Sequence, residues 1–246
     1  GQMFLAATGE TDTVKGMVTI TLGSYNGPAL VVFKGQAGAT YYDEALKAEV
    51  PFPAGLEMNV MVPVLSRNFA ASPFTEAAYR YALQTYTDPR MSRDANLVRL
   101  LTPQRIQVAH DLVRTQINAM LPPSVAVTDI TRLPYIVGPT TAPGAVPNTP
   151  NGLYAITLSS LAYAAKLYNA ALVSARVANV SVTTSPAASL MEQFARDLTD
   201  GRLNTFVDNL PVTDPTLRLY SLSTVELTAF SITSNNTLPA MLAEGV

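Results

Sequence analysis

The chain has 246 residues, of which 48% are hydrophobic and only 14% are charged, and its formal net charge is -2. That length suits one large domain or two small domains that pack closely together. The four lysines are scattered along the chain, so the sequence predicts no nucleic-acid partner, because phosphates require clustered basic side chains. The absence of cysteine excludes disulfides and thiolate metal sites. No apolar run is long enough for a membrane span.

Residues 1–70 have the pattern of β structure. From residue 18 to residue 22, Val, Ile and Leu alternate with Thr, which predicts a half-buried strand. The continuous apolar run at 29–33 predicts a strand covered on both faces. Further strands are expected near 39–42 and over 58–65, with Gly-rich turns between them. This order favours an antiparallel sheet or a small sandwich.

Three pairs of a hydroxyl residue and a proline mark expected helix starts: Ser72-Pro73, Thr102-Pro103 and Ser185-Pro186. The hydroxyl can cap free backbone amides, and proline suits the first helical position. Apolar stripes at helical spacing follow the first two pairs. They consist of Ala77, Ala78, Tyr81, Ala82 and Tyr86, and of Ile106, Ala109, Val113, Ile117 and Met120. A shorter helix is expected over 93–101.

The second half of the chain is expected to begin with a long connection over 122–152, which is rich in Pro, Gly and Thr. Helical spacing resumes at Leu158, and a last helix is expected to end at Asp200-Gly201, where glycine can form the cap. The alternation over 225–229 predicts a strand, and a change of phase near residue 230 predicts a bulge.

These elements together predict an α+β fold, in which an antiparallel β layer or small sandwich is formed by N- and C-terminal strands with an inserted helical block. The β-rich part is expected over 1–70 and the helical block over 71–210, with the long loop at 122–152. Residues 211–246 are expected to return as a strand to the β part.

Several short motifs follow one another in an order that resembles exported modules of proteobacterial cell-surface proteins and lipoproteins. They are Gly27-Pro28-Ala29-Leu30-Val31-Val32, Tyr41-Tyr42-Asp43-Glu44, Ser72-Pro73-Phe74-Thr75-Glu76-Ala77-Ala78, Leu158-Ser159-Ser160-Leu161-Ala162 and Asp197-Leu198-Thr199-Asp200-Gly201. The chain departs from that pattern with Ser72 in place of Thr and with Asn204 where the modules tend to repeat Asp-Gly. The resemblance implies an exported, cell-surface location and no known catalytic activity.

Candidate chemical residues are few. His110 is the only histidine, and no Gly-x-Ser-x-Gly motif supplies a nucleophile for it, so we expect a partly buried or boundary histidine. Asp43 and Glu44 are adjacent and therefore point to opposite sides of a strand. The run 197–201 places Leu198 at a ligand position of a calcium loop, which favours a helix cap instead. The sequence predicts no catalytic residue, no metal ligand and no cofactor.

The resemblance implies an extracellular location, and together with the low charge and the apolar terminal segments it favours a non-catalytic subunit of a filament or cell-surface layer. We expect such a subunit to associate with copies of itself through apolar termini and exposed strand edges. The residues expected at the assembly interface are Phe4, Leu5, Leu238, Met241 and Leu242.

Two alternatives remain open at the level of the sequence. The first is a tethered, adhesin-like module that binds sugar or protein through a patch containing Tyr41 and Tyr42. The second is a glycoside hydrolase, which needs two acids that face a sugar. In each case other surface proteins or glycans are candidate partners, and the expected location is extracellular or on the bacterial cell surface.

Overall fold

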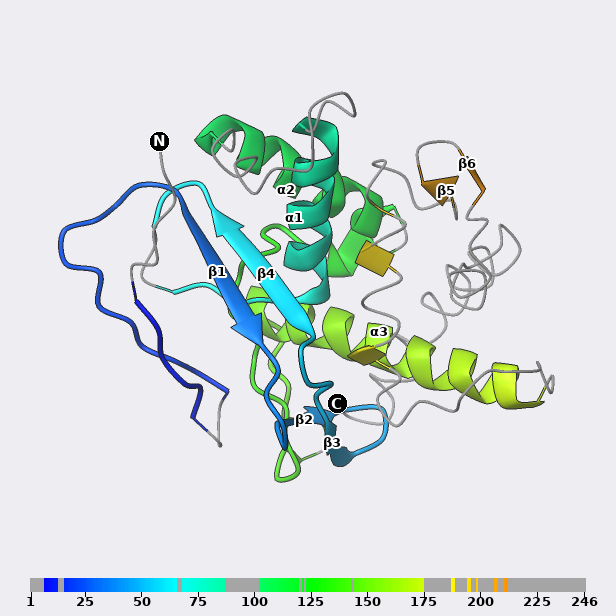
Figure 1. Cartoon of the computed structure of the whole chain (residues 1–246). Coiled ribbons are helices and arrows are strands. Elements are labelled where there is room, and N and C mark those ends of the chain that lie inside the picture. The colour runs from blue at the N-terminus through cyan, green and yellow to red at the C-terminus, as the bar shows by residue number, and fades with distance from the viewer. Residues whose placement is uncertain are drawn as a thin grey trace.

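The computed structural model describes residues 7–12, 16–65, 68–86, 102–119, 121, 123–142, 144–174, 187–188, 194–195, 198, 206–207 and 210–211. In these residues, small antiparallel strand pairs combine with α1 (Pro73–Tyr86), α2 (Pro103–Asn118) and α3 (Pro150–Ser174), with a short 3-10 turn, η2 (Pro123–Val125). The expected α+β fold is confirmed. Figure 1 shows the pair of β1 (Ala29–Lys34) and β4 (Glu57–Val62) lying in front of the helices.

The strands form one bent ribbon. β1 pairs antiparallel with β4, and β2 (Thr40–Asp43) pairs antiparallel with β3 (Ala48–Pro51) further along the same two chain segments. The two ladders share one register. Stepping forward from Ala29 and backward from its partner Val62 by the same number of residues leads to Thr40 and its partner Pro51. The ladder is interrupted between them, where each segment makes a turn. A short third pair joins β5 (Phe206–Val207) to β6 (Leu210–Pro211).

The tip of the ribbon is held by the side chain of Asp43. Its Oδ1 accepts hydrogen bonds from the backbone N–H groups of Ala45 at 3.0 Å and Leu46 at 2.9 Å. Lys47 closes the loop with a positive φ of 53°, a conformation that is uncommon for a residue with a side chain. The Nζ of Lys166 in α3 donates to the carbonyl of Ala45 at 2.9 Å, so the tip is tied to that helix.

The helices begin where local capping chemistry places their first turns. Thr102 caps α2 by accepting a hydrogen bond from the N–H of Arg105 at 3.3 Å, with proline at the first helical position. At α1, Ser72 and Thr75 exchange side-chain to backbone bonds in a closed cap. Both expected starts are confirmed.

The start of α3 was not predicted from the sequence, although it uses the same device. The Oγ1 of Thr149 accepts from the N–H of Gly152 at 3.3 Å, and Pro150 is the first helical residue. The helix therefore begins eight residues before Leu158, inside the segment expected to be loop.

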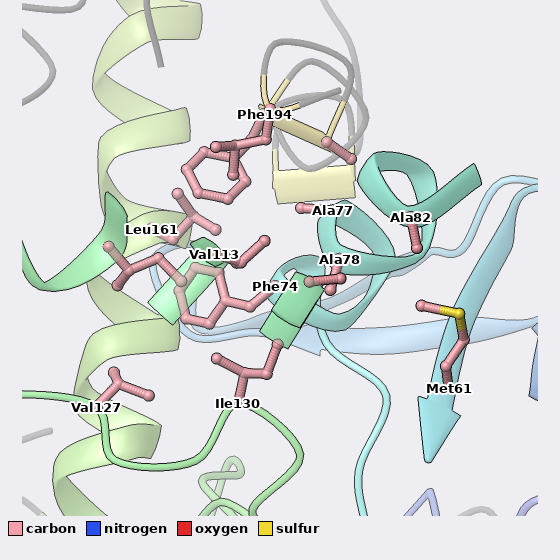
Figure 2. Packing of buried hydrophobic residues seen from close by; sticks show 14 of the residues in the cluster. Met61, Phe74, Ala77, Ala78, Ala82, Val113, Val127, Ile130, Leu161 and Phe194 are labelled. Carbon is pink, nitrogen blue, oxygen red and sulfur yellow. The ribbon is translucent and has the colours of Figure 1, made fainter. Parts of the chain in front are cut away.

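The core is built around α3. From Tyr154 to Ala162, every residue except Leu158 is buried, and since successive helical residues point in different directions, this part of the helix is covered on all sides. Figure 2 shows Leu161 of α3 beside Phe194 and Val113, with Met61 of β4 on the far side of α1. One large cluster thus joins the ribbon and the three helices.

A directed chain of hydrogen bonds crosses this core. The hydroxyl of Tyr154 donates to the carbonyl of Ile130 at 2.6 Å, so the Oγ of Ser72 donates to the Tyr154 oxygen at 2.9 Å. Ser72 in turn accepts from the N–H of Thr75 at 3.3 Å. Because each hydroxyl in this chain of bonds has a partner, the chain fixes the start of α1 against α3 and the segment before it.

Two strand predictions were wrong in part. Residues 16–22 belong to no strand, because no neighbouring segment among the described residues pairs with them. β1 is formed as expected but is not covered on both faces, since the side chain of Val32 is 46% exposed. The residues expected to form a helix over 93–101, a helix start at 185–186 and a strand over 225–229 lie outside the described part of the chain.

Candidate functional site

The two long edges of the β1/β4 ribbon differ in their free backbone groups. The N–H of Gly35 donates to the carbonyl of Leu56 at 2.9 Å, and this bond identifies which residue pairs along β1 and β4 are hydrogen-bonded to each other. Every second residue of an antiparallel strand bonds to its partner, and the residues between direct their N–H and C=O away from it. On β4 the outward residues are therefore Glu57, Asn59 and Met61, and on β1 they are Leu30, Val32 and Lys34.

The outer edge of β4 is closed by side chains from α1 and α2. The outward N–H of Asn59 donates to Oε2 of Glu76 at 2.7 Å, and the Asn59 side-chain amide donates to the same oxygen at 2.9 Å. Glu76 is only 2% exposed, and its other oxygen accepts from Nε of Arg80 at 2.6 Å. A second contact joins the backbone of Met61 to the ring of His110.

His110 is buried more completely than the partly buried or boundary position that the sequence predicted. It is 7% exposed, and burial lowers the pKa of its imidazole, while Asp129 and the Met61 backbone act in the opposite direction. A neutral imidazole has one N–H, which serves the Met61 contact, and within the described residues Nε2 has no hydrogen-bond partner. The carboxylates of Asp129 and Asp111 act on the imidazole through their charge, and the contact with Met61 helps to close the outer edge of β4.

The outer edge of β1 is open. No hydrogen bond from any described residue reaches the outward backbone groups of Leu30, Val32 or Lys34. The side chain of Lys34 instead crosses the ribbon to Glu57 at 3.1 Å, where both groups are exposed. An open strand edge is a template for an added strand, because it carries unpaired donors and acceptors at regular spacing.

The segment before β1 forms an extended arm, defined here as residues 7–12 and 16–22. It turns back on itself at its tip, where the N–H of Asp12 donates to the carbonyl of Met17 at 2.8 Å and Gly9 lies against Val18. Most of its residues are exposed, including Met17 at 44% and Ile20 at 36%. Figure 1 shows the arm (blue) extending away from the helices.

Exposed large apolar side chains are found on the arm and the ribbon, and also on α2 and in the loop before α3. Those on the arm, on the ribbon and between them include Met17, Ile20, Tyr25, Val32 and Val64, which are between 36% and 59% exposed. Isolated exposed apolar residues are ordinary on a protein surface, but an open strand edge that carries one, as β1 does at Val32, is typical of a contact surface. The open edge of β1 and the arm are therefore the candidate functional site.

The residues predicted for the assembly interface cannot be compared with this site. Phe4, Leu5, Leu238, Met241 and Leu242 all lie outside the described residues. Their role stays a prediction.

Tyr41 and Tyr42 do not form one patch, because neighbouring strand residues point to opposite faces. The ring of Tyr41 packs edge-on against Phe52 at 6.0 Å, and burial, with the nearby Asp43 carboxylate, raises the pKa of its hydroxyl. Tyr42 is partly exposed near the carboxylates of Glu44 and Glu49, which together with its burial raise the pKa of its hydroxyl. A ligand-binding role stays a prediction for both residues, and the structure places their rings on different faces of β2.

The adjacent acids at the ribbon tip have different surroundings. Burial raises the pKa of Glu44 to about 7, and the Asp43 carboxylate adds to this effect. Asp43 is only 1% exposed, and its oxygens are engaged by the turn and by the Tyr41 hydroxyl. These two acids therefore do not form a pair that faces a sugar. Among the described residues, no cluster of His, Asp and Glu has the arrangement of a metal site.

Comparisons with known proteins add no relative: no family model, no curated protein and no solved structure matches the chain. The resemblance to exported cell-surface modules therefore stays a prediction. In addition, none of the described helices combines the length and apolarity needed to cross a bilayer.

Sequence reasoning did not find the closure of β4. One signal for Glu76 was present, because an acidic residue in the first turn of a helix meets free backbone N–H groups. That signal did not reveal that Glu76 bonds a strand seventeen residues away in sequence.

Proposed function

We propose that this chain is a non-catalytic structural subunit that works outside the cell, in a filament or a cell-surface layer, by associating with copies of itself. The observation that carries the proposal is the contrast between the two ribbon edges. The edge of β4 is closed by Glu76 and His110, whereas the edge of β1 keeps its backbone groups unpaired among the described residues.

The composition supports the same proposal. Only 14% of the residues are charged, so neighbouring copies meet little electrostatic repulsion. Val32 adds exposed apolar area at the open edge. Apolar burial contributes about 25 cal/mol per Å², and strand pairing adds direction to the contact. The extracellular location rests on the resemblance to exported modules.

The mass of the purified chain over a concentration series tests this proposal. Light scattering and sedimentation velocity should show dimers or larger species that grow with concentration, and negative-stain microscopy should show whether they are regular. A chain that stays at its monomer mass of 26.2 kDa at every concentration would contradict the proposal.

A tethered binding module is the second candidate, and the position of Tyr42 favours it. Its ring is partly exposed beside Glu44 and Glu49, and ligand sites combine aromatic side chains with a few polar groups that fix the orientation of the ligand. Binding to a glycan array that Tyr42→Ala abolishes, and that Tyr135→Ala leaves unchanged, would favour this candidate. Tyr135 is a suitable control because it is 36% exposed in the loop before α3.

A further inference from the structure

We propose that the open edge of β1 accepts the arm residues 16–22 of a second copy of this chain as an added strand. This inference rests on the proposed function and names the contact through which the copies would associate. The contact would be reciprocal in a closed dimer or would run from copy to copy in a filament.

The arm has the properties of a strand without a sheet. Residues 17–22 belong to no helix and to no strand pair, and from Val18 to Thr21 no described residue forms a hydrogen bond with their backbone. Val, Ile and Leu alternate with Thr over 18–22, which is the pattern of a strand with one apolar face. The segment carries no charged residue, so docking would bury no charge.

The arm and β1 also match in length and in the side chains they present. Residues 16–22 are one residue longer than the six residues of β1. Leu30 and Val32 lie on the same face of β1, and Leu30 packs against the core while Val32 is 46% exposed. An added strand with Ile20 on that face would cover Val32 and extend the apolar surface, because side chains on neighbouring strands contact one another.

The loop before β1 directs the arm of the same copy elsewhere. The carbonyl of Gly27 accepts from the N–H of Leu65 at 3.0 Å, so the chain continues past the end of the ribbon before it bends. The bend is held by the hydroxyl of Tyr25, which donates to the carbonyl of Pro28 at 2.6 Å. The edge of β1 thus remains accessible to another copy.

One substitution tests the accepting edge without touching the ladder within the copy. Val32→Pro removes an outward N–H of β1, whereas the bonds to β4 come from the residues on either side. We expect it to raise the dissociation constant for self-association by about tenfold or more. Val32→Thr, which keeps the N–H and suits a strand, should change it by less than about threefold.

The donating arm is tested by Ile20→Asp, with Thr21→Asp as the matched control. The first substitution places a charge on the apolar side of the arm, and the second places it on the opposite side. Ile20→Asp should also raise the dissociation constant by about tenfold, whereas Thr21→Asp should have a smaller effect.

Mixing the two defective variants provides the decisive measurement. A Val32→Pro copy still has an intact arm, and an Ile20→Asp copy still has an intact edge, so an equimolar mixture should form complexes that neither variant forms alone. Sedimentation velocity with one fluorescently labelled variant measures this directly. Because a misfolded variant would not be rescued by mixing, the result separates a lost contact from a lost fold.

The outcomes also separate this inference from the proposed function. If wild-type protein self-associates but Val32→Pro associates equally well, or if the mixture forms no complex, the arm and edge contact is wrong and self-association uses another surface. If the wild type never associates, both ideas are wrong.

Discussion

Replacing Glu76 by Gln should destabilise the protein by about 2–3 kcal/mol, because the buried carboxylate joins α1 to the outer edge of β4. The substitution keeps the size of the side chain and removes its charge. It therefore tests the hydrogen bonds and leaves the packing nearly unchanged.

The expected magnitude follows from the three donors around Glu76. The Asn59 N–H and side-chain amide lie 2.7 and 2.9 Å from one oxygen, and Nε of Arg80 lies 2.6 Å from the other. A glutamine can keep its oxygen toward Asn59, but its amide then faces the Arg80 donor. Losing that charge-assisted bond costs about 1.5–3 kcal/mol, and the two remaining bonds weaken because their acceptor is neutral. Arg80 is partly exposed and can turn toward water, which limits the total.

Urea denaturation followed by circular dichroism measures the change in the free energy of unfolding. Glu57→Gln is the matched control, since its ion pair with Lys34 is exposed on both sides and should contribute less than about 1 kcal/mol. A loss of less than about 0.5 kcal/mol for Glu76→Gln, which is the level of an ordinary surface substitution, would refute the role assigned to this carboxylate.

Three further changes test other parts of the structure. Tyr154→Phe removes the hydroxyl that links two buried groups and should cost about 1–3 kcal/mol in urea denaturation. Gly152→Ala places a methyl group against a loop carbonyl and should lower the free energy of unfolding by about 1–3 kcal/mol, whereas Gly138→Ala, which meets no neighbour, should be nearly neutral. The pKa of Glu44 is raised to about 7 in the folded state, so its neutral form is favoured there and its ionisation destabilises the fold as pH rises through 7. As the pH rises from 4.5 to 8.5, the free energy of unfolding of Glu44→Gln should therefore increase by about 1–2 kcal/mol relative to that of the wild type, a value reduced because Glu44 is partly exposed. Glu49→Gln, at an exposed position, is the control substitution.

The predicted helix starts show which information is local. A hydroxyl that caps free amides and a proline at the next position act within four residues, so Ser72-Pro73 and Thr102-Pro103 could be identified without any tertiary contact. Thr149-Pro150 carries the same signal and marks the start of α3. The surrounding Pro and Gly residues favour a loop and hide this signal.

The candidate site shows the opposite case. The alternation over 18–22 is a strand pattern, but a strand exists only when another segment supplies its hydrogen bonds, and no described segment does so. In the same way, the run 29–33 is apolar enough for a strand covered on both faces, yet the side chain of Val32 is 46% exposed.

By itself, the sequence determined the α+β class, the antiparallel strands, the first turns of two helices and the exclusion of disulfide chemistry, because these depend on composition and on neighbours a few residues apart. Only the tertiary structure decided which edge of the ribbon is open. The edge of β4 is closed by Glu76 and His110, which the packing of α1 and α2 brings from distant positions in the chain. Periodicity along a strand reports its two faces, whereas its edges depend on what lies beside it in space.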